Sequence, residues 1–200
     1  MRRNYSIRPA LLADMPAVGL MQHACWMAAY PGVLDQALLS QLSPEGMANY
    51  HSQHYDAATG APLSSNTAFF VATPDAQQDV VLGMVRGGPT RTKTAAGDPV
   101  PPEVCARFPY ELFAIHIDPM NQRTGIGRSL FARFAHAARV LGHTSVVLWV
   151  LTNNRIGRGF YDRLDGKPVG ECPLSLGGKT YPQLAYVWQD LSALECGATE

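Results

Sequence analysis

The chain has 200 residues, 46% of them hydrophobic, a size and composition that suit one soluble domain with a sizeable core. Lysine plus arginine and aspartate plus glutamate balance at 16 each, so no net charge favours nucleic acid or an acidic membrane as a partner. No apolar run approaches the roughly 18 residues of a membrane span. The four cysteines are widely spaced and form no zinc pattern, so we expect a cytoplasmic protein with free thiols and no metal site.

The first half of the chain predicts three short strands and two helices. Asp14 stands before Pro16 in the position of a helix N-cap, and Tyr30-Pro31-Gly32 ends that first helix. A second helix is expected to begin at Ser43-Pro44. The Gly/Pro/Thr-rich segment 87–109 is long for a connector, and such segments are usually lids or disordered. The predicted strands are 5–8, 67–73 and 80–86.

The second half predicts a strand ending before Asp118, a long helix after Gly125 that Gly142 ends, and strands at 144–151 and 183–191. The fold class expected from this order is α/β: a single three-layer domain over residues 4–192, with a mixed, mostly antiparallel sheet flanked by helices. The apolar face expected for the long helix comprises Ile126, Leu130, Phe131, Phe134, Ala138 and Leu141.

A glycine loop between a strand and a helix is the most informative feature of the chain. Gln122, Gly125 and Gly127 follow the strand and open directly into the helix. Main-chain N–H groups in such a loop are unpaired and convergent, and the helix dipole adds roughly half a positive charge. The loop therefore predicts a phosphate site. Leu130 stands where a dinucleotide fingerprint needs its third glycine, and the chain has no Walker motif.

This pattern resembles the GNAT superfamily of N-acetyltransferases, whose signature after a strand is Gln/Arg-x-x-Gly-x-Gly/Ala. The second half of the family pattern is present too: a strand-like run is followed by Asn154 and, seven residues after it, by Tyr161 in a Phe-Tyr pair. The resemblance is strong over residues 111–166 and looser elsewhere.

The resemblance implies that acetyl-coenzyme A is the co-substrate and that the loop holds its pyrophosphate. It also implies that the strand before the loop splays from its neighbour, so that backbone groups near Ile115 and Ile117 bind the pantetheine arm. Asn154 would bind the same arm, and it can also cap the following helix. Arg123 and Arg128 would add charge, or be ordinary surface arginines. The coenzyme-binding residues implied are Ile115, Ile117, Gln122, Arg123, Thr124, Gly125, Ile126, Gly127, Arg128, Asn154 and Tyr161.

Two residues are expected to move protons. Glu111 matches the position of the general base in histone-acetylating family members, and its strand parity with Ile115 and Ile117 points it into the cleft unless a bulge intervenes. The alternative for Glu111 is a solvated residue at a strand edge. The rival base, His116, falls on the opposite face by parity. Tyr161 matches the tyrosine that protonates the departing thiolate, and it can pack in a helix core at the same time.

The sequence gives little information about the molecule that accepts the acetyl group. Family acceptors bind between the first helices and the final strands, which makes Trp26 and Tyr30 candidate substrate residues, together with Tyr50, His51, His54 and segment 87–109. We expect direct transfer to a primary amine of a small molecule in a ternary complex. A protein N-terminus or lysine acceptor, and a non-catalytic acyl-coenzyme-A sensor, are the alternatives. The sequence is compatible with a homodimer but does not specify the oligomeric state.

Overall fold

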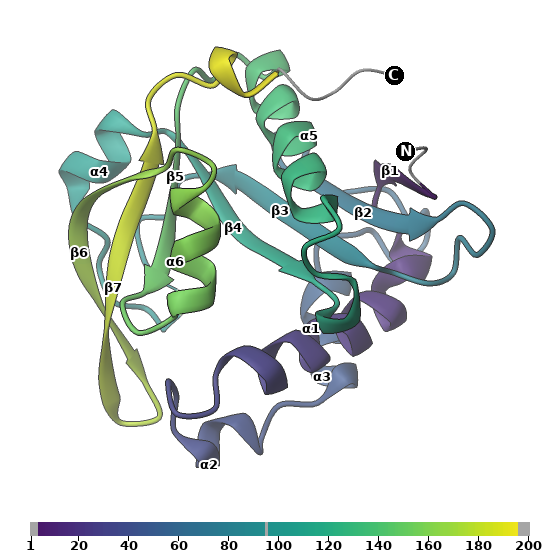
Figure 1. The fold of residues 1–200 in the computed structure, drawn as a ribbon, viewed down its shortest axis with the longest axis horizontal. Coiled ribbons are helices and arrows are strands. Elements are labelled where there is room, and N and C mark those ends of the chain that lie inside the picture. Colours follow the sequence, from purple (N-terminus) through teal and green to yellow (C-terminus); the bar gives the residue numbers. More distant parts are fainter. Residues whose placement is uncertain (1–3, 95, 196–200) are drawn as a thin grey trace.

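The computed structural model describes residues 4–94 and 96–195, which form one seven-stranded mixed sheet with helices on both faces (Figure 1). The strand order is β1-β2-β3-β4-β5-β7-β6. Neighbouring strands are antiparallel except β4 and β5, which are parallel. The expected three-layer α/β fold is confirmed. The strands are β1 (Tyr5–Pro9), β2 (Ala68–Pro74), β3 (Gly83–Pro89), β4 (Tyr110–Ile117), β5 (Val146–Leu151), β6 (Lys167–Leu176) and β7 (Lys179–Trp188), and the helices are α1 (Met15–Ala29), α2 (Gln36–Leu39), α3 (Pro44–Ser52), α4 (Pro102–Arg107), α5 (Ile126–Val140) and α6 (Arg155–Asp162).

Helices α5 and α6 cover one face of the sheet, and α1 and α3 cover the other (Figure 1). Leu130, Phe131 and Phe134 of α5 are at most 1% exposed and pack on the strands, as the helical pattern predicts. Leu141 is an exception, since it is 39% exposed just past the end of α5. On the other face Val18 of α1 is fully buried against the strands.

Asp14 stands at the N-cap of α1, but its side chain does not cap that helix. Its carboxylate instead accepts a hydrogen bond from the main-chain N–H of Leu11, at 2.7 Å, and forms an ion pair with Arg8, also at 2.7 Å. This carboxylate therefore fixes the entry of the chain into α1.

Several parts of the fold differ from the sequence-based expectation. Helix α2 and strand β6 were not expected, and β3 begins at Gly83 rather than at residue 80. The segment 87–109 contains the end of β3 and helix α4 rather than a continuous loop. Its middle is attached to β6, because the Asp98 carboxylate accepts the Ser175 N–H at 2.5 Å and the Cys172 thiol donates to the Pro99 carbonyl at 3.5 Å.

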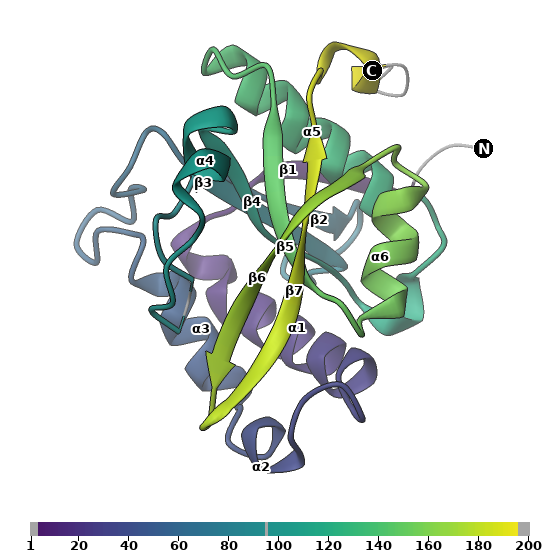
Figure 2. The same ribbon diagram turned by 90° about the vertical axis from the view of Figure 1, so that its left-hand side faces the viewer.

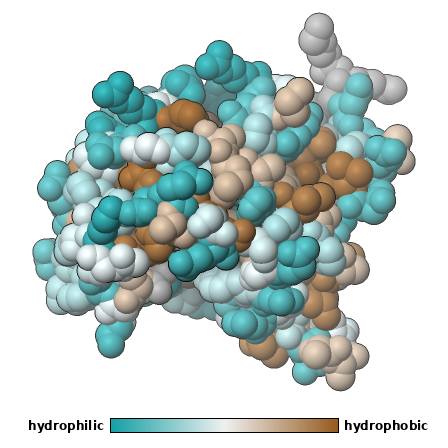
Figure 3. Space-filling view, turned by 90° about the horizontal axis from the view of Figure 1, so that it is seen from below, coloured by the Kyte–Doolittle hydropathy of each residue, from teal (hydrophilic) through white to brown (hydrophobic). Residues whose placement is uncertain are grey.

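The β6–β7 hairpin extends from the sheet until its tip reaches α2 (Figure 2). Lys179 forms an ion pair with Asp35, and the Tyr181 hydroxyl accepts the Asp35 N–H at 3.2 Å. The hairpin and α2 thus close one side of the space beneath the sheet. Seen from below, this face shows several separate apolar areas divided by polar side chains, which do not form a continuous apolar surface for a second copy (Figure 3).

Candidate active site

The loop between β4 and α5 presents a set of unpaired main-chain donors. Gly125 (φ 93°) and Arg123 (φ 63°) adopt left-handed conformations, which turn successive amides the same way. The Thr124 hydroxyl donates to the Asn121 carbonyl at 2.6 Å, which holds the loop without using its amides. Within the described part of the chain, the N–H groups of residues 122–128 donate to no protein acceptor, and this run of amides leads into the N-terminus of α5. This geometry suits a phosphate group.

Strands β4 and β5 separate beside this loop. They are paired at one position only, where Glu111 is opposite Val147. Beyond that pair the facing edges of both strands are open, and residues 113–117 and 149–151 line a cavity of about 1170 Å³. An extended chain with amide groups can therefore bind between them in the manner of an added strand.

The cavity runs from the glycine loop, through this opening, to the space between α1, α3 and the β6–β7 hairpin. The structure brings most of the expected site residues to its wall. Those that line it are Trp26, Tyr30, Ile115, Ile117, Gln122, Arg123, Gly125, Gly127, Arg128, Asn154 and Tyr161. Three expected residues do not line it: Thr124, Ile126, whose side chain is in the core, and Glu111.

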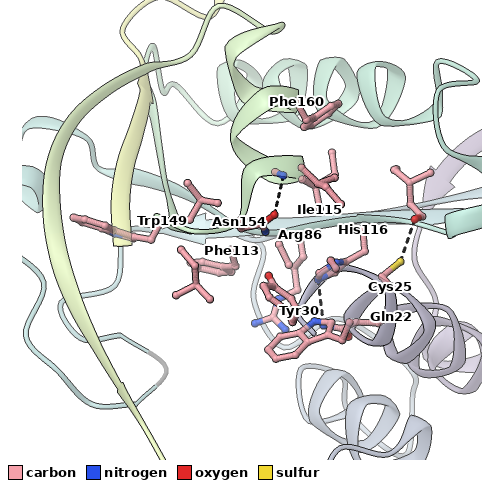
Figure 4. Close-up of a pocket in the computed structure, with 18 of the residues that line it drawn as sticks. Gln22, Cys25, Tyr30, Arg86, Phe113, Ile115, His116, Trp149, Asn154 and Phe160 are labelled. Atoms are coloured by element: carbon pink, nitrogen blue, oxygen red, sulfur yellow. Dashed lines mark hydrogen bonds between the residues drawn. The ribbon is translucent and has the colours of Figure 1, made fainter. Parts of the chain in front are cut away.

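Helix α6 forms the wall opposite the loop. The Asn154 side chain accepts the Gly157 N–H at 2.9 Å, so it caps this helix, as one of its two expected roles requires. Gly127 permits a close approach of the two helices, because a Cβ atom there would lie 3.0 Å from the Phe160 ring. Figure 4 shows Phe160 and Asn154 on this side of the cavity, with Ile115 facing them.

Tyr161 is 9% exposed and contacts the rings of Phe160, Tyr186 and Trp188. Burial, together with the neighbouring Tyr30, raises the pKa of its phenol, so the hydroxyl keeps its proton at neutral pH. Burial likewise raises the pKa of Tyr30, an effect that hydrogen bonding to the Asn154 side chain opposes. The two tyrosines and Asn154 thus meet where the strands separate.

The expectation that Glu111 shares a face with Ile115 and Ile117 is wrong, because a β-bulge lies between them. Arg86 pairs with Ala114 and Gly87 with Leu112, which leaves Phe113 without a partner on β3 and reverses the side-chain parity. Glu111 therefore lies on the His116 side of the sheet. It is fully buried, and its carboxylate accepts the Arg91 N–H at 2.9 Å and forms an ion pair with the Arg91 guanidinium.

A hydrogen-bonded chain of side chains joins β3, α3, α1 and β4 on this second face. Arg86 Nη1 lies 3.2 Å from His51 Nδ1, and His51 Nε2 lies 2.7 Å from Gln22 Oε1. Gln22 Nε2 in turn lies 3.4 Å from His116 Nε2 (Figure 4). Since a guanidinium only donates and an amide oxygen only accepts, each proton position follows: His51 carries its proton on Nε2, and His116 Nε2 is an acceptor.

Both imidazoles in this chain are neutral. Burial, with the nearby positive charge of Arg86 and the histidines His116 and His54, lowers the pKa of His51 to about 3. His116 faces the cavity and is only half-buried, but the surrounding protein excludes bulk water and lowers its pKa to about 4. His116 is thus a neutral acceptor on the cavity wall. His54, expected near the acceptor, does not line the cavity.

Gln22, Arg86 and Arg91 are the site residues that the sequence analysis missed. One signal for Arg86 was present, because an arginine inside the short apolar run GMVRGG is unusual for a buried strand. Gln22 and Arg91 carry no comparable signal, since their roles depend on partners 29 and 20 residues away in sequence.

Cys25 lines the cavity beside β4 and donates its thiol proton to the Ile117 carbonyl at 3.1 Å. Burial raises the pKa of this thiol to about 12. It is therefore a thiol and not a thiolate at neutral pH, which makes it a poor nucleophile.

Residues 35–166 match the Acetyltransferase (GNAT) family, and the chain belongs to this family. It is an acetyltransferase built on the family's fold. No helix in the described part of the chain is long and apolar enough to cross a membrane.

Similar proteins agree with this assignment. A probable N-acetyltransferase of Mycobacterium tuberculosis, Rv2775, is 26% identical over 189 residues, which is 92% of each chain. An N-acetyltransferase structure from Staphylococcus aureus has a TM-score of 0.64 at 16% identity, covering 95% of this chain and 100% of its own. The PaiA N-acetyltransferase of Thermoplasma acidophilum, solved with coenzyme A, has a TM-score of 0.58 at 16% identity, covering 91% of this chain and 98% of its own.

Proposed function

We propose that this enzyme moves the acetyl group of acetyl-coenzyme A to a primary amine of a small molecule, by direct transfer in a ternary complex. The observation that carries the proposal is the set of unpaired N–H groups at residues 122–128, placed at one mouth of a cavity that passes between β4 and β5. A diphosphate at the loop leaves the pantetheine arm aligned with the open strand edges, and the thioester then reaches the centre of the cavity.

Each part of the coenzyme has a complementary surface. Arg123 and Arg128 add positive charge where the diphosphate would bind, and the open edge of β4 around Ile115 and Ile117 offers amide partners to the pantetheine arm. The Asn154 oxygen serves as the helix cap and one N–H of its amide is directed to Tyr30, which leaves the second N–H for the same arm. The PaiA structure with coenzyme A supports a coenzyme site in this fold.

The transfer forms a C–N bond and breaks the C–S bond of the thioester. An N–H of β4 near Ile115 would stabilise the developing oxyanion, a contribution of about 3 kcal/mol in comparable sites. Tyr161, protonated at neutral pH because of its burial, gives its proton to the departing coenzyme A thiolate. The products are the N-acetylated amine and free coenzyme A.

His116 takes the proton that the attacking nitrogen loses. The lone pair of its Nε2 accepts from the Gln22 amide at 3.4 Å, so Gln22 must release it before His116 can take that proton, whereas the carboxylate of Glu111 is held by Arg91 outside the cavity lining. The desolvation that lowers the pKa of His116 acts on an ammonium ion too, so the cavity favours the neutral, nucleophilic amine. Glu111, the base expected from the sequence, then contributes by fixing Arg91.

A small acceptor is favoured over a protein by the cover on the acceptor side. Segment 87–109 is attached to β6 through Asp98 and Pro99 and to β4 through Arg91, and the β6–β7 hairpin is attached to α2. These contacts enclose the space in which a polypeptide acceptor would need an open groove.

The test is the release of free thiol from acetyl-coenzyme A in the presence of a panel of amines and peptides. We expect turnover with small amines. When both substrates are varied, double-reciprocal plots of the initial velocity should give intersecting lines. Parallel lines would contradict direct transfer, and turnover with peptides alone would contradict the small acceptor. Coenzyme binding without turnover on any acceptor would support the sensor alternative instead.

A further inference from the structure

The acceptor end of the cavity contains a buried positive charge that forms no ion pair with a carboxylate of the described residues. Arg86 extends from β3 on the same side of the sheet as His116 and Tyr30 (Figure 4), and it is 6% exposed. Arg86 is not part of the ion pairs Arg8–Asp14, Arg91–Glu111 and Lys179–Asp35, and its side-chain hydrogen bond within the described residues goes to the neutral His51. A buried guanidinium without an anion is destabilising, and a ligand that carries a negative charge would compensate it.

The partners that Arg86 does have are neutral. Nη1 donates to His51, the Tyr50 hydroxyl hydrogen-bonds to the guanidinium, and the rings of Tyr50 and Phe113 each lie 5.4 Å from Cζ. Nε is buried and has no hydrogen-bond partner. The side chain is thus held firmly in place, and part of its capacity to donate hydrogen bonds is unused.

The residues that line the whole cavity also favour a negatively charged ligand at the acceptor end. Among the described residues that line it there is no aspartate or glutamate, and the arginines Arg86 and Arg91 both stand at the acceptor end. The indole N–H groups of Trp26 and Trp149, on two further lining residues, are buried and unpartnered as well. An acceptor with several positive charges, such as a polyamine, would meet the positive charge of Arg86 without a lining carboxylate to bind it.

From this geometry we infer that the acceptor is an α-amino acid, whose carboxylate binds Arg86 while its amine faces His116 and the thioester. The inference rests on the proposed function and names the substrate class of the same site.

The placement of the two groups fits this class. Arg86 pairs across the sheet with Ala114, and His116 lies two residues further along the same face of β4, so the two residues are diagonal neighbours roughly 7–8 Å apart. An α-amino acid carries its carboxylate and its amine on one carbon, and can therefore present them to two such neighbours at once. The aromatic rings of Trp26, Tyr30, Phe113 and Trp149 form walls that suit an apolar side chain on that carbon.

The first test needs no variant. Thiol release from acetyl-coenzyme A is measured with apolar and aromatic L-amino acids and with the carboxamide of each, which keeps the amine and the size but removes the negative charge. We expect kcat/KM for the preferred amino acid to exceed that for its amide roughly 100-fold, as a charge-assisted pair at a buried site implies. Equal rates, or faster turnover of amides or polyamines, would overturn the inference and leave the proposed function intact.

The second test assigns the preference to Arg86. In Arg86→Gln the ratio of kcat/KM for the amino acid to kcat/KM for its amide should fall roughly 100-fold, towards one. In Arg86→Lys the positive charge is present again, so part of this preference for the acid should be restored. Arg133→Gln, at an arginine of α5 that stacks on Phe70 outside the cavity, should keep the wild-type ratio. Calorimetric titration with coenzyme A shows that each variant is folded. An unchanged acid-to-amide ratio in Arg86→Gln would contradict the assignment of the preference to Arg86. If the wild-type enzyme released no thiol with any acceptor, the proposed function itself would be wrong.

Discussion

At the scale of single residues, the account depends on how the protein sets the protonation state of a few buried groups. Tyr161 and Cys25 both have raised pKa values, but the consequences differ. A protonated phenol is a usable acid, while a protonated thiol is a disabled nucleophile. The same burial therefore supports acid catalysis by one side chain and excludes covalent catalysis by the other.

Replacing Tyr161 by phenylalanine should lower kcat by about 10²-fold, in the range of a lost general acid, with little change in the affinity for acetyl-coenzyme A. Steady-state kinetics and calorimetric titration separate the two effects. Tyr55→Phe is the matched control, because its buried hydroxyl donates to the Ala10 carbonyl outside the cavity. Its loss should reduce stability by about 1 kcal/mol and spare kcat. Equal turnover of Tyr161→Phe and the wild type would remove the acid role.

Cys25→Ala should retain kcat within a small factor, since a thiol with a pKa of about 12 does not carry the acetyl group. The measurement is single-turnover transfer from radiolabelled acetyl-coenzyme A. Label trapped on the wild-type protein, together with an inactive Cys25→Ala, would show a covalent intermediate and contradict direct transfer.

Gly125→Asp should abolish coenzyme A binding, because the new side chain forces a non-glycine residue to φ 93° and places a carboxylate beside the diphosphate. Gly142→Asp is the control for backbone strain: Gly142 has φ 88°, ends α5 and is far from the loop in sequence. Calorimetry should show lost binding in the first variant and retained binding in the second. Undiminished affinity in Gly125→Asp would refute the assignment of the loop.

At the scale of helices and strands, the sequence was most informative where a residue's role is local. Gly125, the apolar face of α5 and the Asn154 cap follow from periodicity and from short-range geometry, and the structure has them as predicted except for the exposed Leu141. The face of Glu111 was not predictable in this way, since the bulge at Phe113 depends on how β3 pairs with β4. Strand β6 was missed because much of it is exposed, and its charged, proline- and glycine-containing run lacks a clear apolar alternation.

The hydrogen-bonded chain from Arg86 to His116 connects α1 and α3 to the sheet, and it predicts a pH dependence of stability. His51 has its pKa lowered from 6.5 to about 3 on folding, so the unfolded state binds more protons between these values. The free energy of unfolding should therefore be highest above pH 6.5 and fall as the pH decreases towards 3, by at most about 1.4 kcal/mol per pH unit for this group.

Denaturant titrations at pH 7.5, 6, 5 and 4 measure this dependence. His51→Gln keeps a neutral hydrogen-bonding side chain that does not titrate, and its curve should be flatter than that of the wild type over the same range. His143→Gln, at a histidine outside the cavity, is the control. Identical slopes for His51→Gln and the wild type would contradict the assignment of His51 as a buried neutral group.

At the scale of the whole molecule, the cavity unites features that are far apart in sequence. The glycine loop, the opening between β4 and β5, the α6 cap and the Arg86 chain occupy one continuous space. The glycine-loop end, where we propose that the coenzyme binds, could be located from the sequence because the chain carries the loop as a contiguous motif. The acceptor end is assembled from α1, α3, β3, β4 and the β6–β7 hairpin, and its charge and shape exist only after these elements pack.

We propose that the free amides of residues 122–128 bind the diphosphate of the coenzyme. Calorimetry can test this by comparing the affinity of coenzyme A with that of pantetheine, which keeps the thiol arm and lacks the diphosphate and the nucleotide. We expect pantetheine to bind at least 10²-fold more weakly to the wild-type protein, and Gly125→Asp to remove most of this difference. Equal affinities of the two compounds for the wild-type protein would contradict it.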